Sequence, residues 1–205
     1  MDWIPLFNDK RDRYQRSMVA QGNAAYAAGL ALLMAGDASA AEWFRRAAAR
    51  WRESWDAGAP ADAWGRPVGA LKASLLARDE PALEALAPWT LELGTATAES
   101  PIGRYAGALA LLVLGRWPEA RHVIESLRER DDFPRDVADT LAYIVAHDVV
   151  GYIEAIESVV QSFETREDFL EDMQVADTAL VLAELARRRG IDQPLPESRV
   201  IPRPA

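Results

Sequence analysis

The chain has 205 residues, no cysteine, and 32 acidic against 23 basic side chains, which give a formal net charge of -9 and a pI near 4.8. Half of its residues are hydrophobic, which excludes a disordered chain, and the missing cysteines exclude disulfides and thiolate metal sites. An acidic surface repels phosphate groups, which argues against nucleic acid and anionic membranes as partners and favours a basic protein.

The N-terminal segment lacks the pattern of a secretory signal. Residues 1–7 run directly into the charged residues 9–13, without a basic start and a following apolar run. The most apolar stretch, residues 24–35, is shorter than the roughly 20 residues that cross a bilayer. We therefore expect a cytoplasmic protein that does not span a membrane.

Apolar residues recur at intervals of three and four along nearly the whole chain, which predicts helices and no strands. The first helix is expected to follow an N-cap at Asn8 and to run to about Ala35, and a second helix is expected over residues 38–56. The second helix carries one apolar stripe. Its members are Ala40, Phe44, Ala47, Trp51 and Trp55.

A short polar break between two helices occurs four times. The breaks begin at Gly36, Arg78, Gly115 and His147, at intervals of 42, 37 and 32 residues. Repetition of this kind is typical of stacked helical hairpins, each hairpin being one structural unit.

The C-terminal part of the chain follows a different pattern. Residues 162–174 form an acidic connector, a last helix is expected over residues 175–189, and residues 191–205 contain four prolines and are expected to be extended. The sequence thus predicts an all-α fold with a single domain over residues 1–190. About nine helices would stack as antiparallel hairpins into a short superhelical array with a C-terminal capping helix.

The third hairpin resembles the tetratricopeptide pattern, in which small residues let paired helices approach each other. The matching positions are Ala108, Leu111, Gly115, Ala120 and Ile124. The intervals between breaks differ from the 34 residues of that family. The chain therefore resembles a tetratricopeptide-like (TPR-like) array rather than a set of true repeats.

Residues 70–200 are similar in helix rhythm to the immunity protein 49 family of bacterial competition systems. The resemblance is carried by the segments LLARDEPALEAL, LLVLGRWPEARHVI, AHDVVGYIEAIESVVQSF and ADTALVLAELARRRGI. It implies a protein that neutralises a cognate toxin by binding it. Because the resemblance rests on rhythm more than on identical residues, it assigns no binding residue.

Neither histidine predicts a catalytic or metal site. Asp148, next to His147, is best interpreted as a helix N-cap rather than as the partner of a general base. His122 lies off the apolar stripe of its helix, and the separation of 25 residues between the two histidines does not fit zinc-ligand spacing. Residues 65–69 contain two glycines but lack the lysine and hydroxyl of a P-loop. We predict no catalytic residue, no cofactor and no metal site.

Acidic residues are concentrated in the connector before the last helix. Glu167 and Glu171, like Asp168 and Asp172, are four residues apart, so on a helix each pair would share a face. Such a cluster admits a hard cation, but a solvated acidic face is the preferred interpretation. These four residues are candidates for binding a basic partner.

The chain has seven tryptophans, a residue that anchors both cores and interfaces. Trp51 and Trp55 belong to the apolar stripe and are assigned to the core. Trp43 points off that stripe and Trp64 lies in a linker, so these two are candidate partner-binding residues, with packing beneath the linker as the alternative.

Four arginines lie on the second helix, at helical spacing from acidic residues. They are Arg45, Arg46, Arg50 and Arg52. We expect a paired, solvated face, with a basic groove for an acidic peptide as the alternative.

These observations favour a cytoplasmic protein-binding module without enzymatic activity, in particular an immunity-type inhibitor that binds a basic protein. One alternative is a structural helical protein whose tryptophan-rich half forms a homodimer. Another is an enzyme or small-molecule binder with an unrecognised pocket between helices.

Overall fold

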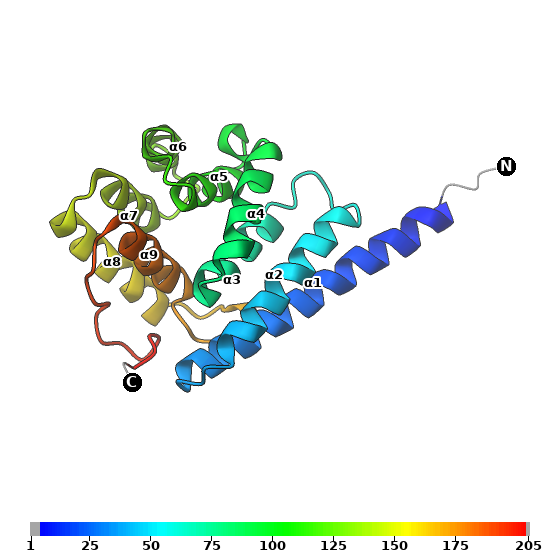
Figure 1. Ribbon diagram of the computed structural model, residues 1–205, viewed down its shortest axis with the longest axis horizontal. Coiled ribbons are helices and arrows are strands. Elements are labelled where there is room, and N and C mark those ends of the chain that lie inside the picture. Colours follow the sequence, from blue (N-terminus) through cyan, green and yellow to red (C-terminus); the bar gives the residue numbers. More distant parts are fainter. Residues whose placement is uncertain (1–4, 204–205) are drawn as a thin grey trace.

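The computed structural model describes residues 5–203, with side chains from Lys10 onward, and consists of helices joined by short connections (Figure 1). The nine α-helices of these residues are α1 (Pro5–Met34), α2 (Ala40–Asp56), α3 (Gly65–Ala77), α4 (Glu80–Glu92), α5 (Pro101–Val113), α6 (Trp117–Arg128), α7 (Arg135–Ala146), α8 (Val149–Glu164) and α9 (Asp177–Arg189). Two single turns of 3-10 helix are η1 (Thr95–Thr97) and η2 (Leu170–Asp172). The all-α prediction is confirmed. Residues 1–4, on which part of the N-terminal interpretation rests, and residues 204–205 of the tail lie outside the described residues.

The first helix begins earlier than the sequence predicts. α1 starts at Pro5, so the predicted N-cap at Asn8 is wrong, and Asn8 lies inside the helix. A proline at the first helical position has its φ angle already set for a helix and has no N–H that needs capping. The helix can therefore begin there without a polar cap.

α2 packs antiparallel to α1 through the predicted stripe. Four members of the stripe, Ala40, Phe44, Ala47 and Trp51, are buried, and Trp55 at the end of the helix is half-buried. Tyr26 of α1 contacts two of these side chains, with ring centroids 5.5 Å from Phe44 and 5.3 Å from Trp51. The aromatic side chains therefore hold the first two helices together.

The later breaks lie where the sequence places them, between α3 and α4, α5 and α6, and α7 and α8. Arg78 and His147 end α3 and α7 in the left-handed conformation, with φ values of 50° and 56°. An aspartate follows each of them and caps the next helix. The carboxylate of Asp148 accepts a hydrogen bond from the backbone N–H of Gly151 at 3.0 Å, which confirms its interpretation as an N-cap.

Helices that follow each other in the chain mostly pack as neighbours, but α9 does not extend this series. It packs against α3 as well as α7 and α8, and Figure 1 shows it beside the last two. In a repeat array each unit would contact only the adjacent units. The structure is thus an all-α assembly of sequential pairs, and a repeated superhelix is not confirmed.

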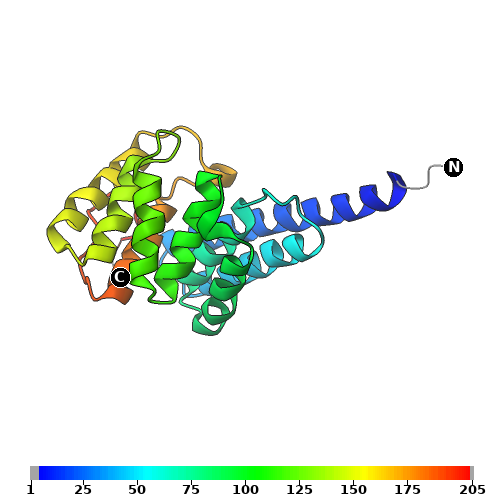
Figure 2. The same ribbon diagram turned by 90° about the horizontal axis from the view of Figure 1, so that it is seen from above.

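The C-terminal tail lies against the helices although it has no helix of its own. The backbone N–H of Ala176, just before α9, donates to the carbonyl of Val200 at 2.8 Å. Ile191, Val200 and Ile201 of the tail are buried. At the other end of the chain, the first turns of α1 extend beyond the rest of the molecule (Figure 2). Among residues 5–203, no helix is both long and apolar enough to cross a membrane.

Candidate functional site

A lysine and an aspartate form an ion pair in the interior, between helices that are far apart in the chain. Lys72 of α3 lies with its Nζ 2.6 Å from Oδ2 of Asp177, the first residue of α9. The hydroxyl of Tyr26 on α1 donates to the same carboxylate oxygen at 2.9 Å. Only 14% of the Lys72 side chain and 16% of the Asp177 side chain are exposed. The ion pair, together with the hydrogen bond from Tyr26, therefore joins α1, α3 and α9 at a position that is largely shielded from solvent.

The surroundings of Asp177 determine its charge state. Burial by itself raises the pKa of this carboxyl, but the charge of Lys72 and hydrogen bonds from Lys72 and Tyr26 outweigh burial and hold the pKa below its usual range. Its place at the start of α9 also suits a negative charge, because the helix dipole is positive there. Burial, and then the adjacent charge of Asp177, raises the pKa of Tyr26. Asp177 is thus ionised and Tyr26 neutral at ordinary pH.

A cavity of about 410 Å³ opens beside this ion pair. Its lining comes from α1, α2, α3, the linker before α3, η2 and the start of α9. The lining residues include Val19, Asn23, Trp51, Arg66, Val68, Lys72, Leu170 and Asp177. Trp51 forms part of the wall because Gly22 of α1 and Gly69 of α3 leave room for its ring, where a Cβ atom would lie 2.8 Å and 2.7 Å from ring atoms.

Two polar side chains of the cavity are held by hydrogen bonds to their neighbours. The indole N–H of Trp51 donates to Oδ1 of Asn23 at 3.1 Å. A terminal nitrogen of Arg66 donates to the side-chain carbonyl of the buried Gln15. The Nε atom of Arg66 is also buried, and it has no hydrogen-bond partner among the described residues.

The four acidic candidates of the connector are all exposed, but they do not share a helix face. α8 ends at Glu164, and η2 contains Glu171 and Asp172 at φ values of 50° and 56°. The prediction of paired helical faces for Glu167/Glu171 and Asp168/Asp172 is therefore wrong. Like charges four residues apart disfavour a helix, and the chain turns here between α8 and α9. In the described part of the chain, no group of three or more histidine and carboxylate side chains is arranged to hold a metal ion.

The two candidate tryptophans lie in different surroundings. The ring of Trp64 stacks on Trp55 with centroids 5.8 Å apart, and Trp55 meets Trp89 edge-on at 6.0 Å. Trp43 is half-buried against the core, with the guanidinium of Arg46 4.8 Å from its ring centre. Both tryptophans thus have packing partners within the chain, and their role in binding a partner stays a prediction.

The arginines of α2 form the paired face that the sequence predicts. Arg46 lies 3.1 Å from Glu42, Arg50 lies 2.5 Å from Glu53, and Arg52 lies 2.9 Å from Asp56. Arg45 lies 3.3 Å from Asp79, the N-cap of α4. A basic groove on α2 is therefore not supported.

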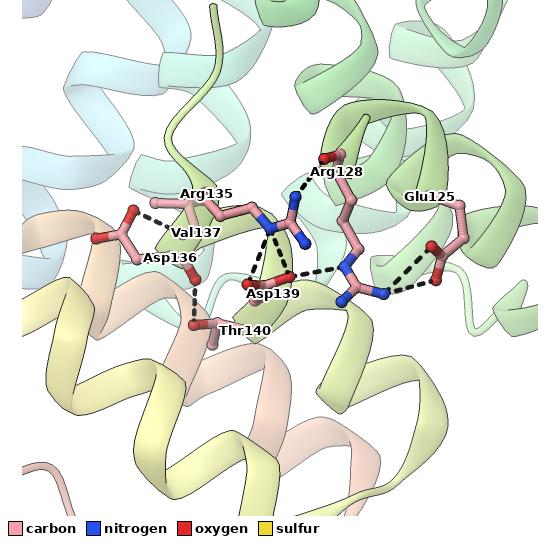
Figure 3. A network of polar contacts seen from close by, with 7 residues as sticks. All are labelled: Glu125, Arg128, Arg135, Asp136, Val137, Asp139 and Thr140. Carbon is pink, nitrogen blue, oxygen red and sulfur yellow. Dashed lines mark hydrogen bonds and ion pairs between the residues drawn. The ribbon is translucent and has the colours of Figure 1, made fainter. Parts of the chain in front are cut away.

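A second group of paired arginines joins α6 and α7. Figure 3 shows Asp139 between two guanidinium groups, at 2.7 Å from Nε of Arg128 and 3.1 Å from Nε of Arg135. Arg128 also lies 3.2 Å from Glu125. Both positive charges are thus neutralised by carboxylates of this chain.

The two histidines lie on the surface. His122 and His147 are both exposed, and His147 supplies the left-handed residue that ends α7. The structure brings neither of them to the buried ion pair or its cavity.

Sequence reasoning missed the Lys72–Asp177 pair and the cavity beside it. The sequence places Asp177 only near the start of the last predicted helix, over residues 175–189. One signal was present: Lys10 and Lys72 are the only lysines, and the other 21 of the 23 basic residues are arginine. A buried lysine in an arginine-rich chain is consistent with a position that suits a compact ammonium group better than a planar guanidinium.

Comparison with known protein families, with curated proteins and with solved structures gives no match to this chain.

Proposed function

We propose that the chain is a cytoplasmic protein-binding module that presents an acidic surface to a basic protein. The acidic surface is formed by Glu167, Asp168, Glu171 and Asp172. In this proposal the module acts as an immunity-type inhibitor, in line with the TPR-like hairpins and the resemblance to the immunity protein 49 family described above.

The observation that carries the proposal is the uneven pairing of charges. Residues 148–172 contain eight carboxylates and a single basic residue, Arg166, whose guanidinium lies 3.9 Å from the ring centre of Phe163. Among the described residues, none of these eight carboxylates takes part in an ion pair, whereas the arginines of α2, α6 and α7 are paired as described above. The excess negative charge of the molecule is therefore concentrated in one segment, where it can attract a basic partner at long range.

An apolar side chain accompanies the acidic surface. Leu170 lies between the two acidic pairs and is 43% exposed. Interfaces combine apolar contacts with a polar rim, and charges at the rim mainly speed association and select the partner. Leu170, flanked in sequence by these carboxylates, suits a partner with an apolar patch bordered by lysine or arginine.

The test uses a basic toxin domain encoded beside the gene as the partner. Binding is measured by calorimetry with the parent chain and with a variant that carries Glu167→Gln, Asp168→Asn, Glu171→Gln and Asp172→Asn. We expect the variant to bind at least tenfold more weakly, with a smaller dependence on salt. The matched control is Glu84→Gln with Glu92→Gln, two exposed glutamates of α4 without an ion pair in the described chain, and it should bind like the parent. The proposal would be refuted if the acidic-surface variant bound the toxin domain as tightly as the control variant. It would also be refuted if the parent chain neither bound the toxin domain nor protected against it.

A homodimer remains the alternative, but the exposed apolar residues that favour it lie on α8 rather than in the tryptophan-rich half named in the sequence analysis. Val150 and Ile153 on the outer side of α8 are 69% and 37% exposed. An apolar strip of this kind can be covered by a second copy of the chain. Light scattering across a concentration series decides this point, because a constant monomeric mass would exclude the dimer.

A further inference from the structure

The cavity beside the Lys72–Asp177 pair has the size and composition of a small-molecule site. It shares only Leu170 with the proposed acidic surface, and none of its charged lining residues belongs to that surface. Its volume of about 410 Å³ lies within the range of roughly 300–1,000 Å³ that is usual for ligand pockets. Such pockets combine apolar walls with a few polar groups that orient the ligand. Both the apolar walls and the orienting polar groups are present in this cavity.

The polar groups that remain available in the cavity are hydrogen-bond donors. Nε of Arg66 is buried and has no partner in the described chain, and a buried donor of this kind is costly unless a ligand or water completes it. Asn23 uses its Oδ1 atom to accept from Trp51, so its amide N–H groups remain. Lys72 has three N–H groups, of which two are directed at Asp177 and at the hydroxyl of Thr178, 3.2 Å away. The site therefore calls for a ligand with acceptor atoms.

The charges of the lining select an anion. Three lining residues are charged, and two of them, Lys72 and Asp177, neutralise each other. Arg66 supplies a further positive charge. The carboxylate of Asp12 is outside the lining. It forms an ion pair with Arg16 at 2.6 Å and also attracts Arg66. The lining side chains thus carry a net charge of +1. A single carboxylate matches it, because its planar oxygens suit a guanidinium.

The remaining walls are apolar. Val19, Val68 and the ring of Trp51 contribute apolar surface, and Leu170 of η2 reaches the same cavity. The apolar part of a ligand that places its acid at Arg66 would lie against these side chains and leave water.

We propose that this cavity binds a small monocarboxylate with an apolar body, such as a medium-chain fatty acid or an arylacetic acid. The carboxylate accepts hydrogen bonds from Arg66, Asn23 and Lys72, and the apolar body lies against Trp51, Val19 and Val68. The Lys72–Asp177 ion pair holds the cavity wall in place and stays formed when the ligand binds.

The experiment measures binding of octanoate and phenylacetate to the full chain by saturation-transfer NMR and calorimetry. Octanamide and phenylacetamide, which have the same shapes without the charge, are the matched probes. We expect each acid to bind at least tenfold more tightly than its amide. Acid and amide binding equally, or neither acid binding at millimolar concentration, would overturn the proposal.

Two variants locate the site. Arg66→Gln should weaken binding of both acids at least tenfold and leave binding of the amides unchanged, whereas Arg121→Gln, at an exposed arginine of α6, should change neither. Val19→Trp fills the cavity from α1 and should abolish binding of both acids, and it tests the site even if Arg66→Gln does not fold. Unchanged acid binding in a folded Arg66→Gln or Val19→Trp variant would place the ligand elsewhere and refute the assignment.

Discussion

Lys72 and Asp177 are held in the interior by each other, which makes them sensitive to the loss of either partner. Lys72→Met would remove the ammonium group. Among the described residues, the hydroxyls of Tyr26 and Thr178 would then be the side-chain hydrogen-bond partners left to the Asp177 carboxylate. Removing one member of a buried pair costs about 3–5 kcal/mol, because the other charge stays desolvated. We expect a loss of about 3 kcal/mol in the free energy of unfolding, measured by urea denaturation.

Two control variants separate this effect from the loss of a surface charge. Lys72→Met combined with Asp177→Asn should recover part of the stability, because no unpaired charge then remains. Arg52→Gln breaks the exposed pair with Asp56 and should cost less than about 1 kcal/mol. If Lys72→Met cost no more than Arg52→Gln, the pair would have no stabilising role.

The lowered pKa of Asp177 gives the pair a defined pH dependence. Lys72 and the hydrogen bonds hold this pKa, despite burial, below the value of about 3.9 in an unfolded chain. The stabilisation is therefore complete above about pH 4 and is lost as the pH falls through the folded-state pKa. We expect the free energy of unfolding to fall below pH 4 more steeply for the parent chain than for the Lys72→Met, Asp177→Asn variant. Parallel curves for the two proteins would contradict this assignment.

At the scale of the residue, the sequence indicates the polar partners only where they are close in the chain. The N-cap role of Asp148 was predictable because its partner, Gly151, is three residues away. The contact among Tyr26, Lys72 and Asp177 forms only when α1, α3 and α9 pack together. No local sequence pattern predicts this contact, because the three residues are far apart in the chain. The rarity of lysine marked Lys72 as unusual but did not identify its partner.

His147 ends α7 in a left-handed backbone conformation that residues other than glycine rarely adopt. Its φ of 56° places its Cβ close to the following carbonyl, and glycine has no such contact. We expect His147→Gly to raise the free energy of unfolding by about 0.5–1 kcal/mol, measured by thermal and urea denaturation. Glu129→Gly is the matched control, because Glu129 ends α6 at an ordinary φ of -80° and should lose stability on substitution. A loss of stability in both variants would show that backbone strain at His147 is negligible.

At the scale of the element, helix positions followed from local signals and loop conformations did not. The breaks before α4, α6 and α8 were predictable from short polar segments containing glycine, proline or aspartate. In the acidic connector, the recurrence of carboxylates every four residues suggests a shared helix face, but the connector is not an α-helix. The positive φ values of Glu171 and Asp172 arise from the path between α8 and α9, which depends on the packing of both helices.

At the scale of the whole molecule, the C-terminal segment closes the fold. The sequence predicts a capping helix at the end of an open array, because periodicity describes each hairpin but not which hairpins meet. In the structure α9 reaches back to α3, and the tail that follows it returns to Ala176 at the start of α9. The helix α9 and the tail up to Arg203 therefore hold the first and second halves of the chain together.

This arrangement makes the tail a stabilising element, although it contains no helix. Val200 is 1% exposed, and its carbonyl accepts the backbone N–H of Ala176, one residue before the buried Asp177. Val200→Ala would leave a cavity and should lower the free energy of unfolding by about 2 kcal/mol. The matched control is Glu197→Ala, an exposed position of the same tail, which should be neutral within about 0.5 kcal/mol. Because the tail supports the turn that leads into α9, Val200→Ala should also speed amide hydrogen exchange at residues 176–180. Equal stability of the two variants would mean that the tail lies on the helices without stabilising them.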